Sequence, residues 1–380
     1  MSTLVAALGW IFMAAALFGA VYALISVRVT ERFFKSARPV ASQCPPLTLL
    51  KPLSGAERGL GENLKTFCTQ DYPSAVQIVF GVQAPDDPAI KIVDALRAAY
   101  PNVEIHLVVG PRSEGFNPKI SNLIGMLPKA KHEVLILSDS DIGVPSDYLR
   151  TIVGALEQSR VGAVTCFYKG AAADNFWSRL AVMGIDYQFL PNGVFAVAAG
   201  VALPCFGSTI GFKKSVLQEV GGFEAFQDRL ADDYEIGRAI RSRGYKLAYP
   251  PIILSHSCPE ATMRDLFEHE LRWSRTIRSI DGAGHAGSIM THTLPLALLG
   301  ALLLGFSTPA IAGLAAAATA RLMQKWQMDR LLGRRGPSLW LLPGRDMLSF
   351  AVFVSAFFTK NVDWRGLRYQ VKPSGVLTRS

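Results

Sequence analysis

Two aspartates that follow a short apolar run are the residues of this sequence best suited to bind a metal. The run from Val134 to Leu137 leads through Ser138 to Asp139 and Asp141, which are one residue apart. Such a run predicts a buried strand, and open α/β sheets bind ligands at the carboxyl ends of their strands. Mg²⁺ or Mn²⁺ takes one or two protein carboxylates and completes its shell with substrate phosphates and water. The spacing therefore predicts a metal that bridges Asp139, Asp141 and a diphosphate. Two aspartates at this spacing also occur in ordinary polar turns. The choice between a metal site and a turn therefore depends on the rest of the sequence.

Alternating strands and helices are predicted around this pair. Short apolar runs indicate strands at Leu47 to Leu50, Val76 to Val82, Val103 to Val109 and Val134 to Leu137. Helical periodicity indicates helices at Leu60 to Gln70, Ala89 to Ala99 and Ile120 to Leu127. Strand and helix repeats of this kind imply a parallel, doubly wound sheet. The sequence has no G-x-G-x-x-G after the first strand, no P-loop motif and no G-x-S-x-G elbow, which disfavours dinucleotide oxidoreductases, P-loop enzymes and α/β-hydrolases.

Three further groups of charged residues are predicted at strand ends or helix starts. Asp86-Asp87 follows the second predicted strand, Asp232-Asp233 precedes a helical pattern, and His269 to Trp273 lies in a charge-rich helical segment. Each has a structural alternative, because an aspartate can cap a helix and an Arg-Trp pair can anchor a helix at a membrane surface. Their occurrence together with Asp139 and Asp141 favours a shared site.

The N-terminus is predicted to be a membrane anchor. The first 27 residues carry no charged side chain, and Leu4 to Val27 exceeds the roughly 20 apolar residues needed to cross a bilayer. Four basic residues follow, namely Arg28, Arg32, Lys35 and Arg38. A cleaved secretory signal would have a basic start and a shorter apolar core, so the anchor is expected to remain. The positive-inside rule then places the following domain in the cytoplasm.

Two apolar blocks near the C-terminus predict further membrane contact. Gly282 to Ala320 is free of charged residues and is long enough for a hairpin that turns near Gly305 and Pro309, or for one long tilted helix. Met347 to Phe358 is too short to span, because Arg345-Asp346 interrupts its extension. The predicted organisation is an anchor at 1–28, a catalytic domain at 40–281, a membrane hairpin at 282–321, a basic loop at 322–345, a short membrane or interfacial segment at 346–359 and a basic tail at 360–380.

The basic charge is predicted to face a membrane. The chain carries a net charge of +9, and many of its basic residues flank the apolar blocks. This pattern suits anionic lipid headgroups, and no nucleic-acid-binding motif accompanies it. The five cysteines are odd in number and lack metal-binding spacing, which fits a reduced, cytoplasmic domain.

With these motifs in place, the chain resembles a GT-A-fold glycosyltransferase, most closely the ceramide glucosyltransferase family, glycosyltransferase family 21. The resemblance rests on Leu50 to Leu53, Gln70 to Pro73, Asp86 to Ile90, Asn117 to Leu123, Ser138 to Ile142, Asp232 to Tyr234 and Arg272-Trp273. It implies a nucleotide-sugar-binding, Rossmann-like α/β sheet with N-terminal and C-terminal membrane helices. Within the family, three segments resemble the bacterial hopanoid-biosynthesis branch more than a true ceramide enzyme. They are His269 to Trp273, Arg275 to Arg278 and Trp364-Arg365-Gly366.

The resemblance also implies roles for individual residues. Asp87, or alternatively Asp86, would meet the uracil or ribose of a UDP-sugar. Asp139 and Asp141 would hold Mg²⁺ or Mn²⁺, and Lys119 would offset diphosphate charge or be a solvated lysine at a helix start. Asp233 matches the general base. His269, Arg272 and Trp273 match a Q-x-x-R-W motif bordering the diphosphate and the acceptor entrance, with His269 replacing Gln, so the donor contacts of that Gln are in doubt.

Together these features predict a membrane-anchored, metal-dependent, inverting enzyme of the bacterial inner membrane. It would move one sugar from a UDP-sugar, with UDP-N-acetylglucosamine preferred, to a lipid hydroxyl, preferably a hopanoid polyol. The alternatives are a ceramide glucosyltransferase, a polyprenyl-phosphate glycosyltransferase, and an inactive nucleotide-sugar-binding scaffold. No nucleic-acid partner is expected.

Overall fold

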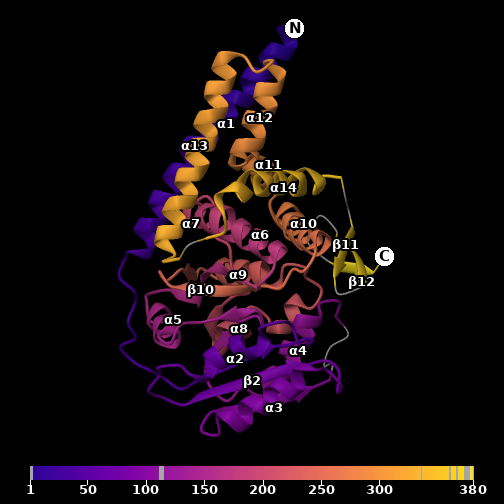
Figure 1. The fold of residues 1–380 in the computed structure, drawn as a ribbon. Helices are drawn as coiled ribbons and strands as arrows, with labels where there is room; N and C mark the ends of the chain where they lie inside the picture. The colour runs from indigo at the N-terminus through magenta and orange to yellow at the C-terminus, as the bar shows by residue number, and fades with distance from the viewer. Residues whose placement is uncertain are drawn as a thin grey trace. The chain divides into compact units, whose positions relative to one another are not determined.

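The chain divides into two units. The computed structural model describes residues 3–110, 115–334, 336–358, 361–364, 367–371 and 377–379. One unit, here called the helical unit, comprises Met1–Phe33, Ala172–Val201 and Glu260–Leu367. The other, the α/β unit, comprises Phe34–Ala171, Ala202–Pro259 and Arg368–Ser380. Figure 1 labels the elements of both units.

A seven-stranded sheet forms the centre of the α/β unit. Its strand order is β3-β2-β1-β4-β8-β6-β9, and a smaller sheet has the order β5-β10-β7. The strands are β1 (Leu47–Pro52), β2 (Val76–Val82), β3 (Glu104–Val109), β4 (Val134–Leu137), β5 (Ile142–Gly143), β6 (Val161–Val164), β7 (Phe167–Ala172), β8 (Ile210–Lys213), β9 (Lys246–Ala248) and β10 (Ile253–Cys258). Strands β1 and β4 are buried along their whole length, which explains their continuous apolar sequence.

The predicted parallel sheet is present for the four strands named from the sequence, and the rest of the sheet is mixed. Strand β1 pairs in parallel with β2 and β4, and β2 pairs in parallel with β3. Strand β8 is antiparallel to both β4 and β6. A strand buried on both faces is apolar whichever way it runs, so strand direction depends on the connection and cannot be predicted from the apolar run.

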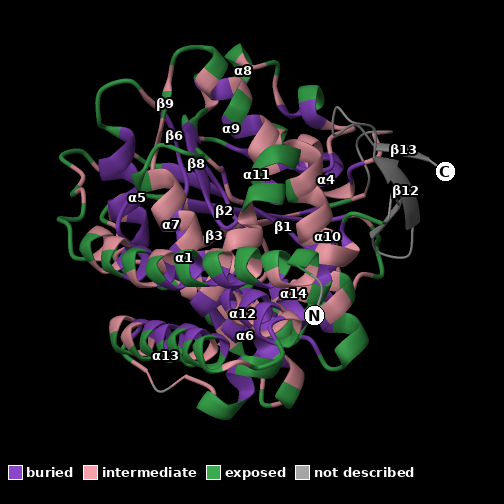
Figure 2. Cartoon of the chain, turned by 90° about the horizontal axis from the view of Figure 1, so that it is seen from above, coloured by how far each residue is buried: buried purple, intermediate pink, exposed green. Residues whose placement is uncertain are grey.

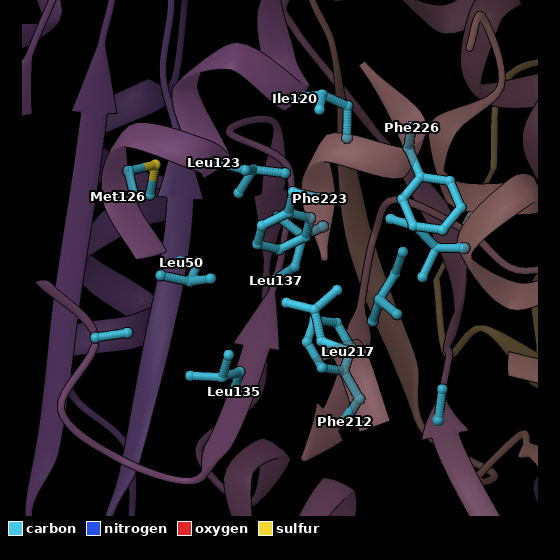
Figure 3. Close-up of a cluster of buried hydrophobic side chains, with 14 of the residues drawn as sticks. Leu50, Ile120, Leu123, Met126, Leu135, Leu137, Phe212, Leu217, Phe223 and Phe226 are labelled. Atoms are coloured by element: carbon cyan, nitrogen blue, oxygen red, sulfur yellow. The ribbon is translucent and has the colours of Figure 1, made fainter. Parts of the chain in front are cut away.

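Helices pack on the sheet, and two of them begin beside the loop that follows β4. The helices are α2 (Leu60–Cys68), α3 (Ala89–Ala99), α4 (Pro118–Met126), α5 (Tyr148–Leu156), α8 (Lys214–Glu219) and α9 (Asp232–Ser242), with short turns η1 (Leu127–Lys129) and η3 (Phe223–Phe226). Figure 3 shows α4 residues Ile120, Leu123 and Met126 packed in one core with Leu137 of β4 and Phe212 of β8. Close packing of this core fixes the position of α4, and therefore of its first residues, relative to the sheet.

The helical unit contains α1 (Thr3–Phe34), α6 (Phe176–Gly184), a π-helical turn η2 (Ile185–Phe189), α7 (Leu190–Ala198), α10 (Met263–Ile280), α11 (Gly282–Gly287), η4 (Ser288–Thr291), α12 (Thr293–Leu303), α13 (Thr308–Leu331), η5 (Leu339–Leu341) and α14 (Leu342–Ser355). Short strands β11 (Asn361–Trp364), β12 (Leu367–Val371) and β13 (Leu377–Arg379) follow. Two helical stretches are long and apolar enough to cross a membrane, Thr3–Phe34 and Phe176–Ala198. The pair Gly282–Thr291 and Thr293–Leu303, bent by 68°, would make a third if it is one span.

Helices α1, α12 and α13 pack through small side chains. Ala16 of α1, Ala297 of α12 and Ala317 of α13 share one buried cluster. A Cβ atom on Gly300 of α12 would lie 3.0 Å from the backbone nitrogen of Met13, so only glycine permits this close approach of the helices. Helices α12 and α13 are joined near Gly305, whose φ of +60° suits glycine.

Two predicted boundaries in this unit were wrong. The predicted loop at 322–345 is helical as far as Leu331, because α13 continues there. The charged pair Arg345-Asp346 does not interrupt the last apolar block, since both residues lie inside α14 and are buried. Arg345 lies 2.7 Å from Glu270 of α10. The carboxylate of Asp346 accepts two hydrogen bonds from the guanidinium of Arg321 in α13, at 2.6 and 2.8 Å. Paired in this way, charged side chains are compatible with a helix interior.

The unit boundaries also differ from the single catalytic domain predicted at 40–281. Residues Ala172–Val201 group with the N- and C-terminal helices, because their apolar sequence packs within the helical unit. One such contact is between the rings of Phe195 and Tyr22, 4.9 Å apart. Arg365 and Gly366, part of the motif linked to the hopanoid branch, lie outside the described residues, as do residues 360, 372–376 and 380 of the predicted tail at 360–380.

Candidate functional site

The proposed metal-binding aspartates lie in a loop that the backbone holds at both ends. Ser138 N donates to Leu50 O of β1 at 3.1 Å, and Asp139 N donates to Gly207 O at 3.0 Å. Asp141 O accepts from Ser257 N of β10 at 2.8 Å. The loop thus joins the carboxyl end of β4 to the small sheet, which fixes where the two carboxylates can point.

Lys119 connects the loop to the start of two helices. Its Nζ lies 2.7 Å from Asp139 Oδ1 and 3.1 Å from Asp232 Oδ2. Burial disfavours the charged form, but the carboxylates of Asp139, Asp232 and Asp233 outweigh it and hold the pKa of Lys119 well above its usual value. Lys119 is therefore a partly buried cation that is ion-paired within the acidic site, and it is not the solvated lysine that the sequence left open.

The N-P-K segment places this lysine by helix capping. Asn117 Oδ1 accepts from the backbone nitrogens of Lys119 and Ile120 at 2.9 and 3.1 Å. Asn117 Nδ2 donates to Arg229 O at 2.8 Å and to Asp232 Oδ1 at 3.1 Å. Pro118 occupies the first helical position, where its missing N–H costs nothing. One buried asparagine thus starts α4 and ties it to the start of α9.

The proposed base shares a peptide group with the metal loop. Asp233 Oδ2 accepts from Gly207 N at 2.9 Å, while Gly207 O accepts from Asp139 N. Burial and then the neighbouring charge of Asp232 raise the pKa of Asp233 to about 6. A carboxyl group with that pKa is suited to general-base catalysis near neutral pH.

Gly207 was not identified from the sequence, and its role follows from the space around it. A Cβ atom there would collide with Asp139 Oδ2 and lie 2.9 Å from Lys119 Nζ. No local pattern distinguishes this glycine among the 33 in the chain, so only the fold reveals that a side chain at this position would fill the site.

Lys51 is a second residue to which the sequence assigned no role. Its side chain is fully buried at the end of β1, and its Nζ donates to Asp139 O at 2.5 Å and to Ser138 Oγ at 3.2 Å. The same nitrogen lies 3.8 Å from the ring centroid of Phe67. Burial lowers the pKa of Lys51 to about 7, although Asp139 and Asp141 act in the opposite direction. The signal in the sequence is a lysine directly after an apolar strand run.

His256 of β10 is the third such residue. Its Nε2 lies 3.2 Å from Asp141 Oδ2, and its ring stacks on Tyr168 with centroids 5.0 Å apart. Burial disfavours the imidazolium, but Asp141 outweighs it and holds the pKa of His256 well above its usual value. In β10 alternate residues are buried, and His256 takes a buried position between Leu254 and Cys258. A histidine in such a register is a signal that sequence analysis could have used.

The acidic pair after β2 contains one ordered and one exposed residue. Both carboxylate oxygens of Asp87 accept from Gly55 N at 3.0 Å, and Oδ1 also accepts from Ala89 N at 2.9 Å. Asp87 thereby holds the loop after β1 against the start of α3. Asp86 is exposed. The geometry favours Asp87 over Asp86 as the residue with a fixed position, and its contact with a donor remains a proposal.

The remaining predicted site residues lie on α10 in the helical unit. The helix begins with a capping box of Thr262 and Asp265. His269 Nδ1 lies 2.6 Å from Glu260 Oε1, and its ring meets that of Trp273 edge to face at 4.5 Å. Arg272 precedes Trp273 on the same helix. The structure therefore brings together five predicted or neighbouring site residues in the α/β unit, namely Lys119, Asp139, Asp141, Asp232 and Asp233. The α10 residues belong to the helical unit.

The two aspartates of the loop fit a divalent cation that is shared with substrate. Within the described ranges no three His, Cys, Asp or Glu side chains gather as a metal cluster. Asp139 and Asp141 would supply two hard oxygen ligands, and the lack of a side chain at Gly207 leaves space beside Asp139 Oδ2. A cation bound by two carboxylates needs further oxygens, which a diphosphate and water provide.

Comparison with known proteins identifies the family of this chain. The family model described as glycosyl transferase family 21 matches residues 10–377. Ceramide glucosyltransferase 1 of Caenorhabditis elegans is 27% identical over 231 residues, which cover 60% of this chain and 49% of the relative. Beta-monoglucosyldiacylglycerol synthase of Synechocystis sp. is 27% identical over 218 residues, covering 55% of this chain and 43% of the relative. The chain thus spans about half the length of these curated relatives.

A solved structure supports the fold. A mannosyltransferase from Pyrobaculum calidifontis, determined with GDP-Man and Mn²⁺, matches with a TM-score of 0.56 and 22% identity, covering 93% of this chain and 99% of that one. The predicted GT-A-type α/β fold is thereby confirmed. The family model extends over nearly the whole sequence and includes both units, so the chain belongs to glycosyl transferase family 21.

Proposed function

We propose that the protein transfers one sugar from a UDP-sugar to the hydroxyl group of a membrane lipid, with a divalent metal and with inversion at the sugar carbon. The observation that carries this proposal is the Gly207 peptide, which accepts from Asp139 N and donates to Asp233. One peptide thus positions a carboxylate suited to a metal diphosphate and a carboxylate suited to a base. A metal-dependent, inverting transfer from a nucleotide sugar to a neutral hydroxyl uses both.

The donor half of the reaction falls to the metal loop. Asp139 and Asp141 would hold Mg²⁺ or Mn²⁺, which when bound neutralises charge on the departing diphosphate. Lys119 adds a second positive charge beside Asp139. As the bond from the sugar to UDP breaks, negative charge grows on the leaving phosphate, and a cation already held in place stabilises it at no cost of reorganisation.

The acceptor half falls to Asp233. Its carboxylate takes the proton from the acceptor hydroxyl while that oxygen attacks the anomeric carbon on the face opposite UDP. The new bond is therefore formed with inversion, which gives a β-linked sugar from an α-linked donor. The backbone N–H groups of Gly207 and Tyr234 each hold one carboxylate oxygen, at 2.9 and 2.8 Å, and a carboxylate oxygen can accept a further hydrogen bond from the acceptor hydroxyl.

Other residues are proposed to select the donor. Asp87, with Asp86 as the alternative, would meet the uracil or ribose. His269, Arg272 and Trp273 of α10 would border the diphosphate and the acceptor entrance, as the family motif implies. The pairing of His269 with Glu260 gives this chain a carboxylate-held imidazole where the motif has glutamine.

The acceptor is proposed to be a hopanoid polyol and the donor UDP-N-acetylglucosamine, on the strength of His269 and the segment from Arg275 to Arg278. Relatives named for ceramide and diacylglycerol support the coarser class, a lipid hydroxyl acceptor. Ceramide glucosylation is therefore the alternative. Purified protein offered a hopanoid polyol and ceramide side by side, with UDP-N-acetylglucosamine and UDP-glucose, decides between them by mass spectrometry of the lipid products. Faster transfer to ceramide would reverse this assignment.

Two further alternatives make different demands on the site. A polyprenyl-phosphate glycosyltransferase uses an acceptor that is already anionic and needs no positioned base, which leaves the raised pKa of Asp233 without a purpose. An inactive scaffold that binds nucleotide sugars would not need the acidic pair, the ion-paired Lys119 and the base together.

The protein is proposed to lie in the bacterial inner membrane with more than one crossing and its α/β unit in the cytoplasm. The charge-free start of α1 and the arginines at its end support this orientation. A reporter fused after Arg38 is expected to be cytoplasmic, and the protein should resist extraction with alkaline carbonate. A periplasmic reporter signal would contradict the orientation.

A further inference from the structure

A groove between α1 and α13 in the helical unit has the chemistry of a lipid site. In their packed region the two helices are close enough that a Cβ atom on Gly313 would collide with Met13. Beyond it lies a groove of about 460 Å³, a volume in the range of pockets that hold small ligands. It is lined by Val21, Leu24, Ile25, Arg28, Val29, Arg32, Met323 and Gln327.

The apolar part of the groove faces the surroundings of the helix bundle. Val21 and Ile25 have exposed fractions of 58% and 48%, although α1 is apolar enough to cross a membrane. Figure 2 shows exposed residues along both α1 and α13. Side chains of this kind are compatible with contact to acyl chains, since hydrocarbon replaces water around them.

The polar part of the groove is cationic. Arg28 and Arg32 are one helical turn apart and so share a face of α1. Both are exposed, and Arg28 keeps 73% of its side chain accessible although Glu31 lies 3.8 Å away. They are the first two basic residues of the chain, so they lie where the apolar part of α1 ends. A guanidinium at that depth pairs well with a phosphate oxygen.

A third polar group points to a ligand with a hydroxyl or other donor. Gln327 lines the groove, and its Oε1 is buried with no hydrogen-bond partner among the described residues. An acceptor left in this state costs free energy unless something in the groove donates to it. The neighbouring Trp326 is 55% exposed and lies under the guanidinium of Arg330 at 4.9 Å. Such a pair is typical of the membrane interface.

We propose that this groove binds one anionic phospholipid, with an acyl chain along Val21, Ile25 and Met323 and the phosphodiester on Arg28 and Arg32. The charge of the groove favours this ligand over the other possible occupants. Arg28 has Glu31 at 3.8 Å, and the excess positive charge of Arg28 and Arg32 favours a lipid with net negative charge over a net-neutral one. A second protein helix would need acidic residues at the same depth. The glycerol headgroup of phosphatidylglycerol also supplies the hydroxyl that Gln327 Oε1 lacks.

The test is lipid binding to the full-length chain in detergent, measured by native mass spectrometry with phosphatidylglycerol or phosphatidylcholine. The wild type is expected to bind its first phosphatidylglycerol roughly tenfold or more tightly than phosphatidylcholine, because the choline cation offsets the phosphate charge that the two arginines attract. The double variant Arg28→Gln, Arg32→Gln should lose that preference. The matched control Arg330→Gln removes a basic side chain that does not line the groove, and should stay within about twofold of wild type.

The apolar part has its own pair of variants. Ile25→Trp fills the groove and should weaken the binding of both lipids, whereas Ile11→Trp, at another exposed position of α1, should leave binding unchanged. Equal affinity of wild type for the two lipids, or an equal loss in Arg330→Gln and the double variant, would overturn the proposal in favour of general surface attraction. Because the readout is binding, failure of the proposed transfer activity leaves this result interpretable.

Discussion

The ammonium nitrogen of Lys119 lies 2.7 Å from Oδ1 of Asp139, the same carboxylate that is proposed to bind a metal. A second carboxylate, Asp232, holds the lysine from another direction at 3.1 Å. Lys119 can therefore keep one ion pair if a metal takes Asp139. This arrangement keeps positive charge beside the acidic loop, and it explains how two aspartates a residue apart are tolerated in a partly buried site.

Replacing the proposed base should separate turnover from donor binding. We expect Asp233→Asn to keep UDP-sugar affinity within a few-fold of wild type and to lower kcat by about 10² or more, because the amide cannot accept the acceptor proton. Single-turnover kinetics and UDP titration measure the two quantities. A large loss of UDP binding with kcat preserved would make Asp233 a donor ligand instead.

The pH dependence follows from the raised pKa of Asp233. Its pKa of about 6 lies above the ordinary value of 3.8, and only the ionised form accepts a proton. Activity at saturating substrate should therefore rise with pH through about 6 and level off above it. Asp86→Asn is the control, because Asp86 is exposed and its replacement should leave the rise of activity with pH unchanged. An activity that is flat from pH 5 to pH 7 is incompatible with the assignment.

A methyl group at Gly207 should disable the site without unfolding the protein. In Gly207→Ala the new Cβ atom meets Asp139 Oδ2 and Lys119 Nζ, so we expect a loss of at least about tenfold in kcat/KM, larger than the change in Tm would suggest. Gly61→Ala in α2 is the matched control, because its Cβ atom makes only ordinary contact at 3.7 Å with Ile92. Equal activity of the two variants would remove Gly207 from the account.

Loss of the buried cation under the loop should weaken metal-dependent donor binding. Lys51→Met removes the donor to Asp139 O and Ser138 Oγ, at a cost of about 1–3 kcal/mol for the acceptors left behind. The expected result is a rise of roughly tenfold or more in the apparent Kd for UDP with Mn²⁺. Lys91→Met, at an exposed position of α3, should bind as wild type. An unchanged Kd in Lys51→Met would show that the loop holds its shape without the lysine.

The parts of this structure that sequence predicts well are those set by local pattern. The bounds of β2, β4 and α3 match the predicted ranges, because buried apolar runs and helical periodicity act over a few residues. The aspartates and Lys119 were found in the same way, as charges at the ends of such runs.

The features that sequence missed depend on contacts between distant segments. The antiparallel β8 and the Gly207 peptide reach the site through a long connection, and Gly207 meets Asp233 only 26 residues further along the chain. Likewise, the charges of Arg345 and Asp346 were taken to end an apolar block, yet Glu270 and Arg321 on other helices neutralise them. No local pattern encodes such pairings.

The central claim is metal-dependent sugar transfer from UDP to lipid, and one assay tests it most directly. Purified full-length protein in lipid vesicles is given radiolabelled UDP-sugar and acceptor lipid with Mn²⁺, and labelled lipid is counted for wild type, for Asp139→Ala and for wild type in excess EDTA. We expect product from wild type alone, with activity restored to the chelated enzyme when Mn²⁺ is returned. Full transfer in excess EDTA, or by Asp139→Ala, would contradict the account.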